Sequence, residues 1–133
     1  MFSTTSPLPR NMNDLLYTRT HMWIRTEGSE ATVGLTEYGQ KELGDVVFVD
    51  IPKEGTELVK GHECGAMESV KTVESIFSPV SGVVIRSNSQ LQETPELMNS
   101  SPCGDGWMFT VKMGDASELS EYLNGTGYKE LCE

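Results

Sequence analysis

The chain is divided into many short apolar segments by glycine and proline, and this pattern restricts its fold more than any other feature. Its 133 residues include 13 glycines and 6 prolines. Short apolar runs between turn residues are typical of β-strands, whereas long helices need an unbroken helical period. A chain of this length fits one domain. The sequence therefore predicts a compact, mostly β domain, a flattened sandwich or barrel with short helices at its margins.

Individual elements follow from local patterns. The run Val46–Ile51 is apolar on both faces, which predicts a buried strand, and residues 87–102 are polar, which predicts a loop. Thr36 is an expected N-cap, Asp115 and Glu118 have the spacing of a capping box, and Gly125 is expected to end the helix that follows. Helices are predicted at about 36–43, 116–124 and 127–132, and strands at 22–26, 31–35, 46–51, 56–59, 65–70, 73–77, 83–85 and 107–113.

The first residues differ from the rest of the chain. Residues 1–13 are rich in Ser, Thr, Pro and Asn, and Arg10 is their one charged residue. This composition predicts either a flexible extension or a short organelle leader, cut near Arg10, ahead of a domain at 14–133. A leader would place the protein in a mitochondrion or a mitochondrion-related organelle. The alternative is the cytoplasm.

Charge and composition exclude several classes of function. Lys and Arg total 10 against 20 Asp and Glu, so the net charge is −10, which disfavours nucleic acid and anionic membranes as partners. Cys64, Cys103 and Cys132 share no CxxC spacing, so we expect neither a disulfide framework nor an oxidising compartment. The two histidines lie far apart in sequence, which disfavours a zinc site. Nucleophile-elbow, dinucleotide-binding and P-loop motifs are absent, so a self-contained enzyme is not expected.

Lys71 is the residue that carries the most functional information. The sequence around Lys71-Thr72 is nearly symmetric, with Val70 and Val73 flanking the pair, and it predicts a tight two-residue hairpin turn with the valines in the strands. Such turns usually contain Gly, Asn or Asp, which are missing here. Lys71 is then either an ordinary solvent-exposed charge or the attachment point of a prosthetic group carried on a long side chain.

Several motifs resemble the glycine cleavage system H protein family. Residues 68–71 (ESVK), followed by 78–82 (SPVSG), are similar to its lipoyl-attachment signature. The likeness covers nearly the whole chain, because residues 17–24, 33–38, 43–49, 95–99 and 106–108 resemble other ordered motifs of the family.

The resemblance implies a fold, a cofactor and a set of partners. It implies a lipoyl-domain fold, a barrel-sandwich hybrid, and a monomeric carrier that is not itself an enzyme. One lipoate would be attached covalently to Lys71, and Glu68 would be recognised by the lipoate-attaching enzyme. The arm would receive an aminomethyl group at the pyridoxal-phosphate-dependent glycine decarboxylase, deliver it to the tetrahydrofolate-dependent aminomethyltransferase, and be reoxidised by dihydrolipoamide dehydrogenase.

Two positions depart from the family pattern. Met22 stands where the family usually has Glu, and Ser75 stands where it often has an acidic residue. In the family those carboxylates are thought to shelter the amine of the loaded arm, so their loss predicts weaker sheltering. His21, Met22 and Ser75 are the predicted cleft residues, although His21 also suits a purely structural role. Trp23 and Trp107 are expected in the core.

Three other functions stay open at this point. The chain could serve mainly as a lipoyl donor or relay for other lipoyl proteins, which the two departures favour. It could be a lipoyl or biotinyl domain of a different complex, but biotin carriers prefer methionine on both sides of the lysine, where this chain has Val70 and Thr72. It could also be an interaction protein in which Lys71 stays unmodified.

Overall fold

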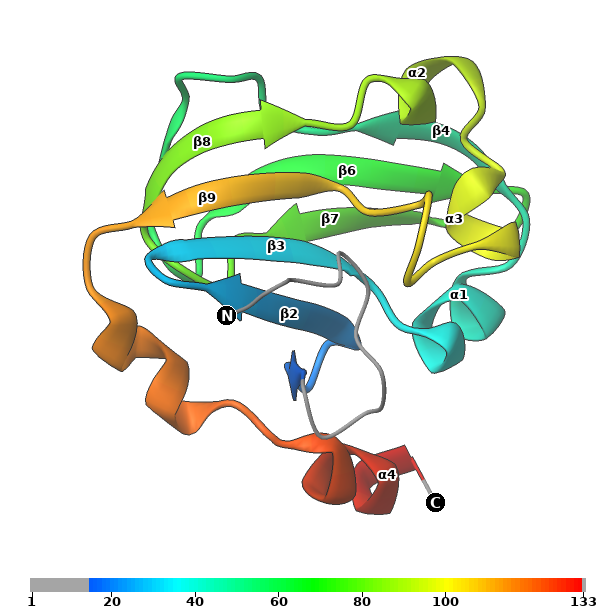
Figure 1. Ribbon diagram of the computed structural model, residues 1–133. Helices are drawn as coiled ribbons and strands as arrows, with labels where there is room; N and C mark the ends of the chain where they lie inside the picture. The colour runs from blue at the N-terminus through cyan, green and yellow to red at the C-terminus, as the bar shows by residue number, and fades with distance from the viewer. Residues whose placement is uncertain (1–14, 133) are drawn as a thin grey trace.

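Two antiparallel sheets form the domain in the computed structural model, which describes residues 15–132. The larger sheet has the strand order β1-β2-β3-β9-β8-β5, and the smaller one has the order β4-β6-β7 (Figure 1). The predicted fold class, a mostly β sandwich with short helices, is confirmed. The strands are β1 (Leu16–Tyr17), β2 (Met22–Glu27), β3 (Glu30–Leu35), β4 (Val46–Asp50), β5 (Glu57–Leu58), β6 (Glu63–Ser69), β7 (Val73–Phe77), β8 (Gly82–Ser87) and β9 (Phe109–Met113).

The helices lie at the margins of the sheets. Helix α1 (Glu37–Leu43) begins as predicted, because the Thr36 hydroxyl accepts a hydrogen bond from the Gly39 amide at 3.0 Å. It ends at Gly44, whose φ of 89° is readily adopted only by glycine. The others are α2 (Gln90–Glu93), α3 (Leu97–Ser100), the 3-10 helix η2 (Ala116–Glu121) and α4 (Gly125–Cys132). None of the helices in the described part of the chain has the length and apolarity needed to cross a membrane.

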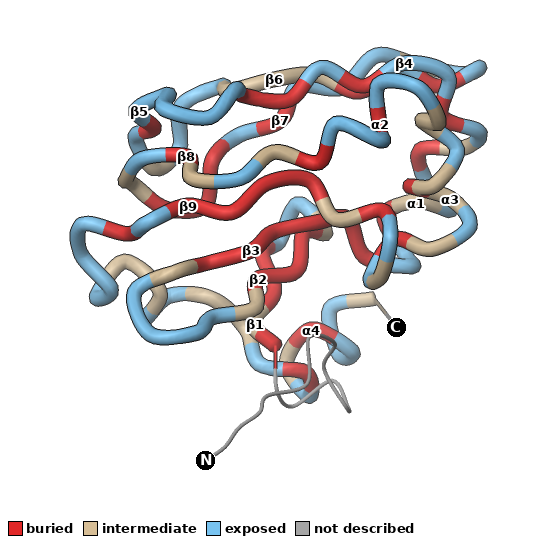
Figure 2. Tube along the Cα trace, turned by 45° about the horizontal axis from the view of Figure 1, so that its top comes forward, coloured by how far each residue is buried: buried red, intermediate tan, exposed pale blue. Residues whose placement is uncertain are grey.

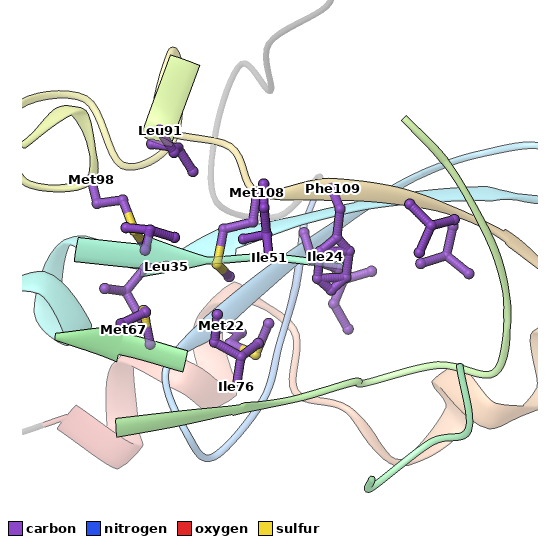
Figure 3. Close-up of a cluster of buried hydrophobic side chains, with 14 of the residues drawn as sticks. Met22, Ile24, Leu35, Ile51, Met67, Ile76, Leu91, Met98, Met108 and Phe109 are labelled. Carbon is purple, nitrogen blue, oxygen red and sulfur yellow. The ribbon is translucent and has the colours of Figure 1, made fainter. Parts of the chain in front are cut away.

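The inner faces of the two sheets enclose one apolar core. Met22, Ile24 and Leu35 of the larger sheet face Met67 and Ile76 of the smaller sheet, as Figure 3 shows. Leu91 of α2 and Met98 of α3 are fully buried and close one end of this core. The buried segments follow β2, β3 and β9 in Figure 2, whereas most connecting loops are exposed. Burial of this apolar surface provides the main driving force for folding.

Several sequence predictions about single elements were wrong. The strand at 46–51 is not buried on both faces, because β4 is an edge strand with a register shift between Val46 and Phe48. An extra residue at such a bulge changes the direction of the side chains. Val47 and Phe48 are consequently 51% and 56% exposed. The polar segment 87–102 is not only loop, because it contains α2 and α3, each a single turn.

The C-terminal region also differs from the prediction. The expected helix at 116–124 is a shorter 3-10 helix, because Glu118 does not complete the capping box. Its carboxylate instead accepts hydrogen bonds from the Ser81 amide and hydroxyl, at 2.7 and 2.8 Å. Gly125 does not end a helix but begins α4, whose Gly127 amide donates to the Asn124 side chain at 2.8 Å. Trp23 is 1% exposed, as expected, but Trp107 is only partly buried.

Two predictions about the chain as a whole are not tested by the fold. The extension or leader at 1–13 lies outside the described residues, so it stays a prediction together with the domain boundary at 14.

All three cysteines are free thiols, and burial is the main cause that raises the pKa of Cys64 to about 11.

The packing of Trp23 against β3 gives a test of a second apolar cluster, which Trp23 forms with Leu15, Tyr17 and Tyr128. A Cβ at Gly34 would lie 2.4 Å from the Trp23 ring, which is held by its indole N–H bond to the Pro102 carbonyl at 3.0 Å. We expect Gly34→Ala to lower the free energy of unfolding by about 1–3 kcal/mol, since this cluster is overpacked. Urea denaturation measures this change. Gly114→Ala is the control, because a Cβ there meets nothing within 4 Å. Equal stability of the two variants would contradict this packing.

Candidate functional site

The turn that carries Lys71 is held by one serine side chain. Pairing of β6 with β7 ends at Glu68 and Val73. The turn therefore comprises the four residues 69–72, of which Ser69 is also the last residue of β6. The Ser69 hydroxyl oxygen accepts hydrogen bonds from the Lys71 and Thr72 amides, both at 3.1 Å, and the Ser69 amide donates to the Thr72 carbonyl at 2.8 Å. A serine hydroxyl thus organises the turn without Gly, Asn or Asp.

The predicted two-residue turn was therefore wrong. Val70 lies inside the turn, and Val70 and Val73 are 69% and 65% exposed, so the valines do not anchor the strands in the core. Lys71 is exposed, as its predicted role requires. Among the described residues the ion pairs are Lys60–Glu121 and Arg86–Glu30, so the Lys71 ammonium has no carboxylate partner there.

A second contact joins the turn to the body of the domain. The Val70 amide donates a hydrogen bond to the Asp45 carbonyl at 3.0 Å, in the segment between α1 and β4. The Lys71 side chain crosses Gly44, since a Cβ at Gly44 would lie 2.9 Å from the Lys71 Cε. In Figure 1 the end of β6 lies beside α1 and α3, at one end of the sandwich. Lys71 therefore projects from a turn that is fixed at both its strands and its tip.

Exposed apolar side chains lie on the outer face of the smaller sheet, whose strands β6 and β7 lead into the turn. Phe48, Glu68 and Val73 are paired across β4, β6 and β7, so their side chains share this face, and all three are exposed. Glu68, the predicted recognition residue, thus stands between two apolar side chains. We call the exposed apolar residues of β4, β7 and the turn the tip face: Val47, Phe48, Val70, Val73 and Phe77.

A cleft of about 330 Å³ lies next to the turn. The structure brings the three predicted cleft residues His21, Met22 and Ser75 together in its lining. Met22 is 4% exposed and belongs mainly to the core. The wall also contains Glu42 and Leu43 of α1, Thr72 of the turn and Glu74 of β7.

Glu42 and Glu74 are cleft residues that the sequence analysis missed. Side chains alternate along a strand, and Glu74 pairs with Met67, whose side chain is buried, so Glu74 shares the core side of β7. Ser75 pairs with Ala66, so its side chain belongs to the outer side of β7, although the residue also borders the cleft. This alternation was the available signal for Glu74. Glu42 becomes a cleft residue only through the packing of α1, which local sequence does not show.

His21 has structural partners in addition to its place in the cleft. Its Nδ1 lies 2.8 Å from the Tyr128 hydroxyl, which is 2.6 Å from the Thr36 hydroxyl, so Tyr128 links α4 both to His21 and to the start of α1. Its ring also packs against Tyr38, with centroids 4.6 Å apart. Burial lowers the pKa of His21 from its ordinary value, and the nearby Glu42 carboxylate offsets part of this change.

The fold and the exposed hairpin lysine define the class of protein: a two-sheet β-sandwich of the lipoyl-domain type. The model of the glycine cleavage H-protein family matches residues 15–133. This chain belongs to the glycine cleavage H-protein family.

Individual relatives agree with this assignment. A probable glycine cleavage system H protein of Haloarcula marismortui is 47% identical over 91% of this chain and 95% of its own. A mitochondrial glycine cleavage system H protein of Flaveria pringlei is 45% identical over 96% of this chain and 82% of its own. The crystal structure of a glycine cleavage system H protein from Mycobacterium marinum has a TM-score of 0.82 at 31% identity, covering 89% of this chain and 95% of that chain.

The lowered pKa of His21 predicts a pH dependence of stability. The native state binds fewer protons than the unfolded chain near the ordinary pKa of about 6.5. Stability is therefore lost as the pH falls from above 6.5 through the lower native value. His21→Asn should reduce this loss, and asparagine tolerates the φ of 70° at this position. Urea midpoints of both proteins across this pH range measure the effect, and identical pH profiles would contradict it.

Proposed function

We propose that this chain is a lipoyl carrier of the glycine cleavage system, with lipoate bound as an amide to Lys71 Nζ. The observation that carries the proposal is an exposed lysine, without a carboxylate partner among the described residues, on a turn fixed by Ser69 and Asp45. When bound, the lipoyl group supplies a disulfide that can take up an aminomethyl group and two electrons. The chain itself provides the attachment point and the surfaces around it, and it catalyses no step.

The role of the protein is to hold one flexible arm on a rigid support. A tethered group stays near its targets at an effective concentration of about millimolar, so transfer does not depend on free diffusion. The fixed turn sets the position from which the arm starts. The cleft beside it offers an apolar floor and carboxylates at its wall, a surrounding that suits an arm carrying an ammonium group.

The proposed partners are glycine decarboxylase, the aminomethyltransferase, dihydrolipoamide dehydrogenase and the lipoate-attaching enzyme. Each must admit the Lys71 arm, so each approaches the tip face. The apolar side chains of this face alternate with the exposed carboxylates of Asp45, Asp50 and Glu68, and the whole chain carries a net charge of −10. A complementary partner surface is therefore apolar with a basic rim.

The alternative function, a lipoyl donor or relay for other lipoyl proteins, rests on Met22 and Ser75 replacing acidic residues. Glu42 and Glu74 in the cleft wall weaken that argument, because the cleft keeps two carboxylates. Normal turnover of glycine by the loaded chain with its partner enzymes would argue against the relay. Transfer of lipoyl groups to other acceptors without such turnover would favour it.

The compartment is a separate part of the proposal. We place the protein in a mitochondrion or related organelle because residues 1–13 lack acidic side chains and are rich in Ser and Thr. N-terminal sequencing of the native protein tests this, and an intact Met1 would favour the cytoplasm.

Lys71→Arg is the direct test of the attachment site. We expect complete loss of lipoylation, because a guanidinium cannot be acylated by the attaching enzyme, with no measurable change in stability, because the side chain is exposed. Intact mass and peptide mapping after incubation with lipoate ligase, ATP and lipoate measure the outcome. Lys53→Arg, at another exposed lysine, is the control and should load normally. Loading of the Lys71 variant would refute the assignment.

Glu68→Gln tests recognition by the attaching enzyme. The carboxylate lies on the exposed face one residue before the turn, where a basic group of the enzyme can reach it. Removing its charge should lower kcat/KM for lipoate transfer by about tenfold, the value of one charge-assisted hydrogen bond. Glu63→Gln, at the far end of the same strand, is the matched control and should leave the rate unchanged. Equal rates for both variants would show that Glu68 is not recognised.

A further inference from the structure

Asn99 uses its whole side-chain amide on the segment between α1 and β4. Its Oδ1 accepts a hydrogen bond from the Val46 amide at 2.8 Å. Its Nδ2 donates to the Gly44 carbonyl at 2.9 Å and to the Gln40 side-chain oxygen at 3.0 Å. Asn99 therefore holds the backbone on both sides of Asp45.

Asp45 is the residue whose carbonyl fixes the lysine turn. The Val70 amide donates to this carbonyl at 3.0 Å, and the Lys71 side chain crosses the neighbouring Gly44. Asn99 thus acts on the turn through three residues of backbone, Gly44 to Val46, of which it holds the first and the last. The position of Asp45 sets the position of the turn, and Asn99 sets the position of Asp45.

The support for Asn99 comes from the core. Asn99 lies in α3, next to Met98, which is fully buried, so the short helix is anchored by packing. Within the segment 44–46, Val46 is buried in the core and pairs with Ser69 of β6, whereas Gly44 ends a helix with a positive φ and Asp45 is exposed. Asn99 therefore adds a hold on the exposed residue Asp45 through both of its neighbours.

Asparagine suits this task because one planar group both donates and accepts. A hydrocarbon side chain would leave the Gly44 carbonyl and the Val46 amide without their partner. An ionised aspartate could accept from Val46 but could not donate to Gly44, and its charge would oppose the carbonyl oxygen. The three hydrogen bonds thus require an amide at this position.

We infer that Asn99 is a positioning residue for the lysine turn, which it holds through Asp45 so that Lys71 meets its enzymes in one place. The inference rests on the proposed function of Lys71 as the lipoyl attachment site. Asn99 touches neither the lysine nor the cofactor. Without its side chain, Asp45 is free to move, the Val70 amide loses its acceptor, and the turn samples positions that do not fit an enzyme's entrance.

The test uses the full chain and measures two properties in Asn99→Ala and Asn99→Asp. The first is amide hydrogen exchange at Val70, compared with the core amides of Val33 and Val111. The second is kcat and KM for lipoate transfer to Lys71 by a lipoate ligase, per mole of folded protein. We expect Val70 exchange to rise about tenfold beyond any change in the core amides, and kcat/KM for transfer to fall about tenfold. Asn99→Asp keeps the acceptor for Val46, so it should show the smaller effects.

Gln40→Ala is the matched control. It removes one of the three bonds of Asn99 but leaves Gly44 and Val46 held, so both properties should stay near their native values. Because Asn99→Asp has nearly the shape of asparagine, it keeps the test available if Asn99→Ala does not fold.

Two outcomes would overturn the inference. One is a rise in Val70 exchange no larger than that of the core amides, which would mean that Asn99 contributes only to global stability. The other is unchanged lipoate transfer in both variants although the native chain loads normally. A native chain that cannot be loaded at Lys71 would instead refute the proposed function, and this inference with it.

Discussion

The hydrogen bond from the Val70 amide to the Asp45 carbonyl joins the tip of the lysine turn to the segment between α1 and β4. The pairing of β4 with β6 ends at Val46 and Ser69, so this bond extends the support one residue further into the turn, where the ends of hairpins otherwise fray. Ser69 closes the turn internally and Asp45 fixes it externally. Together they combine a rigid support with a long, exposed side chain, which is what a carrier needs.

The same end of the molecule also combines two kinds of surface. The outer side of β4, β6 and β7 is apolar with carboxylates between the apolar side chains, and the cleft on the other side of the turn contains His21, Glu42 and Glu74. The first surface suits contact with other proteins, whereas the second suits an arm at rest. The turn that carries Lys71 borders both surfaces, since Val70 belongs to the tip face and Thr72 lines the cleft.

The sequence predicted what depends on local patterns. The hairpin of β2 and β3 and the start of α1 follow from alternation and a capping threonine, and the symmetry around Lys71 indicated the place of a turn but not its form. The errors arose where tertiary contacts decide. The Glu118 carboxylate accepts a hydrogen bond from the Ser81 amide instead of completing a capping box. A bulge in β4 exposes Phe48, which was predicted to be buried because its neighbours are apolar.

The site shows the same division between near and distant contacts. Lys71 and Glu68 were predicted as site residues from their resemblance to a family motif, and both lie within one hairpin. The support of that hairpin comes from Asp45 and Asn99, which are 25 residues before and 29 residues after Val70. No local pattern relates residues at such separations, because their proximity is a product of the sandwich itself. The segment that follows α1 is held by the burial and pairing of Val46 and, from a third element, by the side-chain amide of Asn99, so its place depends on contacts that no local pattern contains.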